Sequence, residues 1–146
     1  MYFVDRKHIK ELLEYMDELL QELDKHPFEA RIEKLALERM THLIIESIID
    51  VGNLMIDGFI MRDPGSYEDI IDILVDEKVL PEAEINHYKE VIALRETLVK
   101  EYPRVDYEHL IQIMMTNKEI LSQFSTHIQS YLKNELDVAH AFSNEN

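Results

Sequence analysis

Glycine and proline are scarce in this chain. Only three glycines and four prolines occur among its 146 residues. This scarcity leaves room for few tight turns and favours long helices. Helix-forming residues such as Leu, Glu, Lys, Met and Ala dominate the remainder, and no stretch alternates strictly between apolar and polar residues over more than a few positions. The sequence therefore predicts an all-α protein.

Apolar residues recur at intervals of three and four along each long segment of the chain. This spacing is typical of helices that bury one apolar stripe. Proline ends or opens several of these segments, because it cannot continue a helix and disfavours helix in the residue before it. The expected helices cover residues 6–26, 28–57, 67–78, 81–102 and 107–136.

Four long helices and one short helix, joined by short connections, predict an antiparallel up-and-down helical bundle. A chain of this length with 46% apolar residues is expected to form a single domain, 1–146, with a sizeable core. Three of the helices are preceded by good N-cap residues, Asp5, Ser66 and Asp106. The residues from about 137 to 146 are expected to form a frayed tail.

Composition and charge exclude several classes of protein. The formal net charge of −15 argues against broad affinity for nucleic acid or for an anionic membrane, because phosphate contacts need clustered Lys and Arg. The chain has no cysteine, which excludes disulfides and thiolate zinc sites. No apolar run approaches the ~18 residues of a membrane span, and the first residues do not form a signal peptide. We therefore expect a cytoplasmic protein.

The expected second helix, 28–57, combines an apolar surface with a polar seam. Between Leu35 and Ile56 it is apolar on nearly all sides, as in a buried helix. Five polar residues spaced by three and four nevertheless share one stripe: His42, Glu46, Asp50, Asn53 and Asp57. The seam lines either a cleft or polar interface, or the narrow edge of the helix that faces solvent. Gly52 within this helix would allow another helix to approach closely.

Metal-binding patterns are weak. A di-metal carboxylate bundle needs two Glu-x-x-His pairs and two further Glu residues, whereas only Glu84 and His87 have this spacing. His42 and Glu46, one helical turn apart, could chelate a metal but are more typical of a hydrogen-bonded pair. No glycine-rich phosphate loop and no nucleophile elbow occurs. We expect neither a metal nor a cofactor.

The end of the expected fourth helix carries the motif with most functional content. Residues 93–102 read Ala-Leu-Arg-Glu-Thr-Leu-Val-Lys-Glu-Tyr. This segment resembles the Arg-Asn-x-x-x-His-x-Tyr signature of HEPN domains of the HepT-like toxin family. Arg95 and Tyr102 match the Arg and the Tyr at the right separation, and Leu98 and Val99 match the apolar pair between them.

The resemblance extends over nearly the whole chain. The expected second helix, with Glu46, Asp50, Gly52 and Asn53, looks like the second helix of the family. Residues 64–67, Pro-Gly-Ser-Tyr, look like the Pro-x-Ser-Tyr entry to its third helix. Within the family, the chain is most similar to the YutE-type branch.

This resemblance implies a homodimeric helical bundle. Active members of the family are metal-independent ribonucleases in which the Arg and His of two protomers meet in a cleft. A nucleotidyltransferase antitoxin of the MNT type silences them by adding adenylates to the motif Tyr. The resemblance thus implies Arg95 as a catalytic residue, Tyr102 as a site of modification, and an MNT-type antitoxin as a partner.

Two motif positions depart from the family. Glu96 stands at the family's Asn and Lys100 at its His. Histidine titrates near pH ~6.5 and exchanges protons at neutral pH, whereas lysine, near ~10.4, does not unless its pKa is strongly lowered. Lys100 could still bind a phosphate, but Glu96 is placed to pair with it at i, i+4 and mask its charge. We therefore interpret the chain as a catalytically degenerate relative of the toxin ribonucleases.

Two alternatives stay open. The chain could be an active metal-independent ribonuclease in which Arg95 orients phosphate and Lys100 or His109 assists, or a non-enzymatic dimeric binding or scaffold protein. Arg104 and His109 repeat the Arg–His spacing, but they straddle Pro103 and the start of the fifth helix, which indicates coincidence. The catalytic candidates are Arg95, Lys100 and Tyr102. The residues expected to line a cleft are His42, Glu46, Asp50, Asn53, Glu96 and His109.

Overall fold

The computed structural model describes the backbone of residues 4–145 and the side-chain surroundings of residues 4–136. This part of the chain forms helices and connections and contains no strand. The elements are α1 (Arg6–Glu22), α2 (Arg31–Gly58), α3 (Tyr67–Asp76), the 3₁₀ turn η1 (Glu82–Glu84), α4 (Ile85–Lys100), the 3₁₀ turn η2 (Tyr102–Arg104) and α5 (Tyr107–Glu145). The prediction of four long helices and one short helix is confirmed.

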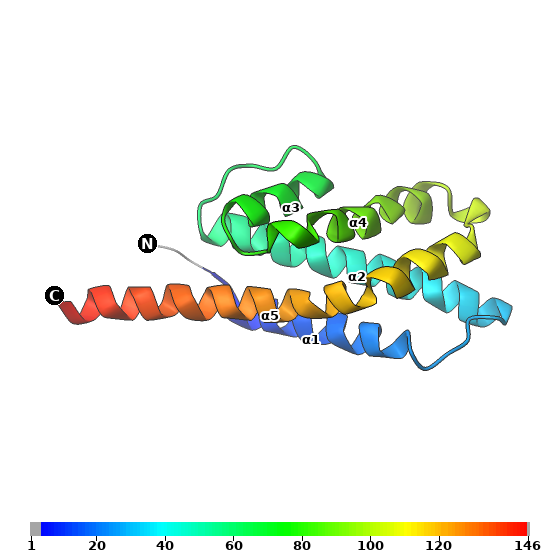
Figure 1. The fold of residues 1–146 in the computed structure, drawn as a ribbon, viewed down its shortest axis with the longest axis horizontal. Coiled ribbons are helices and arrows are strands. Elements are labelled where there is room, and N and C mark those ends of the chain that lie inside the picture. The colour runs from blue at the N-terminus through cyan, green and yellow to red at the C-terminus, as the bar shows by residue number, and fades with distance from the viewer. Residues whose placement is uncertain (1–3, 146) are drawn as a thin grey trace.

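The four long helices run along the long axis of the molecule, and each runs opposite to the long helix before it (Figure 1). The short α3 lies at one end, where it packs against α2 and α4. The helix α2 is central, because it contacts α1, α3 and α4, while α5 packs on α1 and α4. This arrangement is the antiparallel up-and-down bundle expected from the sequence. None of the helices within the described residues has the length and apolar character needed to cross a membrane.

The predicted N-caps of three helices are confirmed. The side chains of Asp5, Ser66 and Asp106 each accept a hydrogen bond from the backbone N–H three residues further on, at 3.0 to 3.2 Å. Each bond satisfies one of the backbone donors that a helix start leaves unpaired. These three positions therefore fix where α1, α3 and α5 begin.

The start of α2 and the end of α5 differ from the prediction. The backbone of Phe28 has a φ of 54°, in the left-handed region, so the helix begins only at Arg31. The helix α5 continues beyond Leu136 to Glu145 and extends past the rest of the bundle (Figure 1). The frayed tail predicted for residues 137–146 lies outside the residues whose side chains are described.

Both ends of α4 also differ from the prediction. The 3₁₀ turn Glu82–Glu84 follows Pro81, and the α-helix itself starts at Ile85. The helix stops at Lys100, so Tyr102 lies in η2 rather than on α4. This places the last residue of the motif on a separate short turn.

Gly52 marks the tightest contact between α2 and α3. A methyl group at this position would overlap the Cγ2 atom of Ile70, which is itself buried. The expected close helix approach at Gly52 is confirmed. The start of α2 is less covered than expected, since Leu35 remains 46% exposed.

Candidate functional site

Arg95 lies at the meeting point of three helices. Its Nε donates a hydrogen bond to Glu46 Oε1 on α2 at 2.6 Å. Its guanidinium carbon lies 4.5 Å from the centre of the Tyr67 ring, at the start of α3, within the range of a cation–π contact. The side chains of Arg95 and Glu46 are only 25% and 31% exposed. The hydrogen bond to Glu46 raises the pKa of Arg95, so the guanidinium stays charged and is already paired with a carboxylate.

The polar seam of α2 reaches this cluster through Glu46. His42 Nε2 lies 3.4 Å from the same Oε1 atom of Glu46, one helical turn away. Asp50 lies one helical turn from Glu46 in the other direction. Burial, and next the charge of Glu46, raise the pKa of Asp50, whereas the charge of His8 on α1 lowers it by a smaller amount. Further along the seam Asn53 is half-buried and Asp57 is exposed. The seam therefore begins beside Arg95 and ends as a solvent-facing edge of the helix.

A hollow of about 400 Å³ adjoins Arg95 on the side of α3. It is lined by Ser66, Tyr67, Glu68, Ile92, Ala93, Arg95, Glu96, Val99 and Lys100. Lys100 Nζ lies 3.8 Å from Glu96 Oε1, and both side chains are more than 70% exposed. The i, i+4 pair expected from the sequence is confirmed. The hollow thus holds two cations and two carboxylates, a balance that does not favour a phosphate.

The other two motif candidates lie outside this hollow. Tyr102 is 66% exposed on η2. His109, near the start of α5, lines a different groove that contains neither Arg95 nor Lys100. His42 and Arg95 both contact the same oxygen of Glu46, Oε1. Sequence reasoning placed His42 on a possible cleft but gave no signal that Glu46 would bind Arg95, because 49 residues separate them.

The Glu-x-x-His pair at the start of α4 has two separate sets of partners. Glu84 accepts a hydrogen bond from the Tyr88 hydroxyl at 3.1 Å, and its two carboxylate oxygens lie 3.1 and 3.3 Å from His127 Nε2. His87 Nδ1 lies 2.7 Å from Asn117 Oδ1. Among the described residues, no three His, Cys, Asp or Glu side chains converge where a metal ion could bind. This pair therefore connects α4 to α5.

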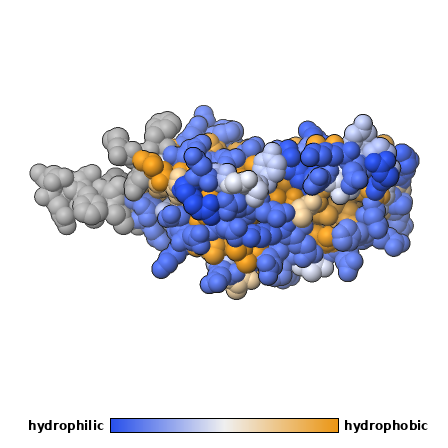
Figure 2. Space-filling model, turned by 90° about the horizontal axis from the view of Figure 1, so that it is seen from above, coloured by the Kyte–Doolittle hydropathy of each residue, from blue (hydrophilic) through white to orange (hydrophobic). Residues whose placement is uncertain are grey.

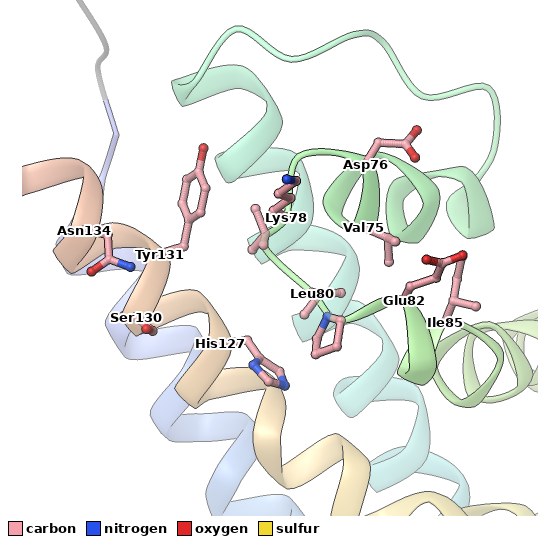
Figure 3. Close-up of a pocket in the computed structure, with 12 residues that line it drawn as sticks. Val75, Asp76, Lys78, Leu80, Glu82, Ile85, His127, Ser130, Tyr131 and Asn134 are labelled. Atoms are coloured by element: carbon pink, nitrogen blue, oxygen red, sulfur yellow. The ribbon is translucent and has the colours of Figure 1, made fainter. Parts of the chain in front are cut away.

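A larger hollow of about 630 Å³ separates the α3–α4 connection from α5. Figure 3 shows Lys78 and Glu82 on one wall, and His127, Ser130 and Asn134 on α5 opposite them. No sequence motif predicted this hollow, because its walls come from segments about fifty residues apart. It shares no residue with the hollow beside Arg95.

Known proteins resemble this chain over almost its whole length. The family described as Ribonuclease HepT-like matches residues 9–128. The protein named "Putative RNase YutE" from Bacillus subtilis (strain 168) is 48% identical over 143 residues, which cover 97% of this chain and 99% of the relative. A solved structure of YutE from Bacillus subtilis, described as a cytosolic protein of unknown function, superposes with a TM-score of 0.91 over 93% of this chain and 96% of that one. This chain therefore belongs to the ribonuclease HepT-like family.

Proposed function

We propose that this protein is a catalytically degenerate HepT-like protein, which keeps the position of the family's active site but has lost its ribonuclease chemistry. The observation that carries the proposal is the pair of Arg95 with Glu46 at 2.6 Å. A phosphate of RNA would have to displace this carboxylate from a partly buried position before Arg95 could bind it.

The replacement of the motif His supports the same conclusion. Lys100 is an exposed ammonium whose Nζ lies 3.8 Å from Glu96 Oε1. An ammonium side chain in water holds its proton at neutral pH, unlike an imidazole. Lys100 therefore cannot supply the proton transfer that a histidine supplies at pH 7. The net charge of −15 further opposes the approach of RNA.

An RNA cleavage assay with purified protein tests the proposal. We expect the native protein and Arg95→Ala to give the same background. Restoring a histidine in Lys100→His should not be sufficient, because Glu46 still occupies Arg95, whereas Lys100→His combined with Glu46→Gln should cleave above background. Cleavage by the native protein that Arg95→Ala abolishes would overturn the proposal.

A second candidate is an active metal-independent ribonuclease in which His42 provides the proton transfer. The distance of 3.4 Å between His42 Nε2 and the carboxylate that binds Arg95 favours it over Lys100 or His109. In the same assay this function requires cleavage that His42→Gln abolishes and His109→Gln leaves unchanged. An equal loss of RNA cleavage in His42→Gln and His109→Gln would exclude His42 as the group that transfers the proton.

We propose that the protein acts as a homodimer in the cytoplasm. Exposed large apolar side chains lie near the motif: Tyr67 and Val99 line the hollow with Arg95, and Leu35 lines a neighbouring one with His42 and Leu98. Such residues favour a covered face, because an exposed apolar patch is typical of protein–protein contact. Light scattering at micromolar concentration tests this, and a monomer there would contradict it.

We also propose a place in a toxin–antitoxin pair with an MNT-type nucleotidyltransferase that modifies Tyr102. The exposure of Tyr102 on η2 supports this, since a transferase must reach its hydroxyl. Incubation with such an enzyme and ATP should add the mass of one or more adenylates to the native protein and none to Tyr102→Phe. An unchanged mass of the native protein would count against the pairing.

A further inference from the structure

A second groove lies on the side of α4 that faces away from the hollow beside Arg95. It has a volume of about 540 Å³ and runs between the end of α4, η2 and the start of α5. Its walls are Glu90, Ala93, Leu94, Thr97, Leu98, Glu101, Arg104, Val105, Asp106, His109, Leu110 and Ile113. Only Ala93 also lines the hollow beside Arg95.

The floor of this groove, which we call the α4–α5 groove, is aliphatic. Leu94, Leu110 and Ile113 are core residues that reach the floor, and Leu98 and Val105 are partly exposed there. The floor therefore suits an apolar side chain rather than a sugar or a phosphate, which would lose hydrogen bonds to water without finding new partners.

The rim of the α4–α5 groove is acidic. Three exposed carboxylates, Glu90, Glu101 and Asp106, stand on it against the exposed guanidinium of Arg104. One oxygen of Asp106 caps α5, but its negative charge remains at the rim. Figure 2 shows a mostly hydrophilic face over α3 and α4, with apolar residues gathered in strips between the polar ones. An aliphatic floor inside a negative rim selects a ligand that is apolar at its centre and positive at its edges.

We propose that the α4–α5 groove docks a protein partner through an amphipathic helix with aliphatic side chains on one face and Lys or Arg beside them. A helix laid in an apolar groove is a common recognition mode, and the acidic rim supplies the charge complement. RNA is repelled by the same carboxylates, and a second copy docked groove to groove would place its own rim carboxylates against them. The inference does not depend on whether the Arg95 site cleaves RNA.

The test measures binding of a synthetic helical peptide of Leu and Lys, labelled with fluorescein, to the full-length protein by fluorescence anisotropy. A peptide with Glu in place of every Lys keeps the apolar face and reverses the charge. We expect the Lys peptide to bind, with an affinity that falls as salt rises, and the Glu peptide not to bind. Equal binding of the two peptides would show that the rim makes no selection and would overturn the proposal.

Variants place the peptide in the groove. Thr97→Arg puts a long cation over the floor and should weaken binding about tenfold or more, whereas Thr97→Ser should bind as the native protein does. Glu101→Lys changes only the exposed rim and should weaken binding about threefold. Glu18→Lys makes the same charge change on α1, which does not line the groove, and should have no effect.

Four further outcomes would overturn the proposal. A native protein that binds neither peptide overturns the proposal, and so does a loss as large in Glu18→Lys as in Glu101→Lys, because binding would then follow net charge alone. A dimer that Thr97→Arg dissociates would assign the groove to a second copy of the chain. Binding of a labelled uridine oligonucleotide that Thr97→Arg changes would assign it to RNA. Either assignment would overturn the proposal.

Discussion

The two halves of α4 hold their polar side chains in opposite ways. At its start Tyr88 is fully buried, and its hydroxyl donates to Glu84 and lies 3.3 Å from the backbone oxygen of Ile120 on α5. At its end Arg95 has one carboxylate partner on another helix, and Lys100 has only a neighbour on its own helix. The first half connects α4 to α5 through a fully buried side chain, whereas in the second half burial decreases from the partly buried Arg95, which binds α2, to the exposed Lys100.

This difference explains how the motif can diverge while the fold stays the same. A polar group at the start of α4 cannot be removed without leaving a buried partner unsatisfied, which is costly. A residue such as Lys100 can replace another with little effect on folding, because its side chain is mostly in water. The stability of the bundle therefore places little constraint on the residue at position 100, which can change without loss of the HepT-like architecture, whereas Arg95 is held to α2 by Glu46.

The largest effect is expected for Tyr88→Ala. The ring is fully buried and packs edge-on against Phe124, with ring centres 5.7 Å apart. Its removal should lower the free energy of unfolding by about 3–5 kcal/mol, measured by urea denaturation. Burial raises the pKa of Tyr88 far above its ordinary value, so the hydroxyl remains a donor at any ordinary pH.

Tyr88→Phe is the matched control for that prediction. It keeps the ring and removes only the hydroxyl, so it should cost about 1–2 kcal/mol, the value of a lost hydrogen bond that leaves Glu84 with one donor fewer. If Tyr88→Ala lowered the free energy of unfolding no more than Tyr88→Phe does, the buried ring would not stabilise the start of α4, and the contrast between the two halves of this helix would be wrong.

Asn117→Ala should have the second largest effect. This fully buried amide joins α5 to itself and to α4: its Nδ2 donates to Ile113 O at 2.8 Å, and its Oδ1 faces His87 Nδ1 at 2.7 Å. The variant removes the partner of His87 Nδ1 and the second hydrogen bond at Ile113 O, which keeps its helical backbone bond, and it should lower the free energy of unfolding by about 1–3 kcal/mol in the same urea assay. Asn134, an exposed amide on the same helix, offers a control, since Asn134→Ala should leave stability unchanged within about 0.5 kcal/mol.

The contrast between local and distant contacts also sets how much the sequence could predict. The helix stripes and the caps at Asp5, Ser66 and Asp106 follow from residues close together in the chain, and they are confirmed. The glycine at position 52 correctly predicted a close helix approach, but the sequence did not identify its partner, Ile70 on α3. The late start of α2 could not be predicted, because it depends on the left-handed backbone of Phe28, a conformation that a Phe rarely adopts.

The candidate site was predictable only in part, for the same reason. The pair of Lys100 with Glu96 is local and follows from the i, i+4 spacing. The pair of Arg95 with Glu46 depends on how α2 and α4 pack, which no spacing within one helix contains. The spacing of Glu84 and His87 was too weak to predict a metal site, and it could not identify the partners that packing of α5 gives the two side chains, His127 and Asn117.

Asp50→Asn tests the seam of α2, where an exposed carboxylate lies one helical turn from the partly buried Glu46. Burial, and next the charge of Glu46, raise the pKa of Asp50 in the folded protein. Between its ordinary pKa near ~3.9 and the raised value, the unfolded chain is ionised while the folded protein still holds the proton. The native protein should therefore lose stability relative to Asp50→Asn as pH rises through this window, and the difference should stay constant above it. Because Asp50 is exposed and water screens its interactions, we expect the loss to stay below about 0.5 kcal/mol.

Urea denaturation of both proteins across that pH range measures the difference. Asp57→Asn is the control, because it removes an exposed carboxylate from the same seam, eleven residues away from Glu46. A native protein that gains stability relative to Asp50→Asn as pH rises would reverse the sign and show that Asp50 is stabilised as a carboxylate.

The smallest effect is expected for Lys100→Gln. Its ammonium and the carboxylate of Glu96 are both more than 70% exposed and 3.8 Å apart, so water and salt screen most of their attraction. The substitution should change the free energy of unfolding by less than about 0.3 kcal/mol, with urea midpoints that coincide at high salt. A loss above about 1 kcal/mol would mean that the end of α4 depends on Lys100 for its structure. Lys100 would then be needed for folding, and the residue at this motif position could not be replaced without a cost in stability.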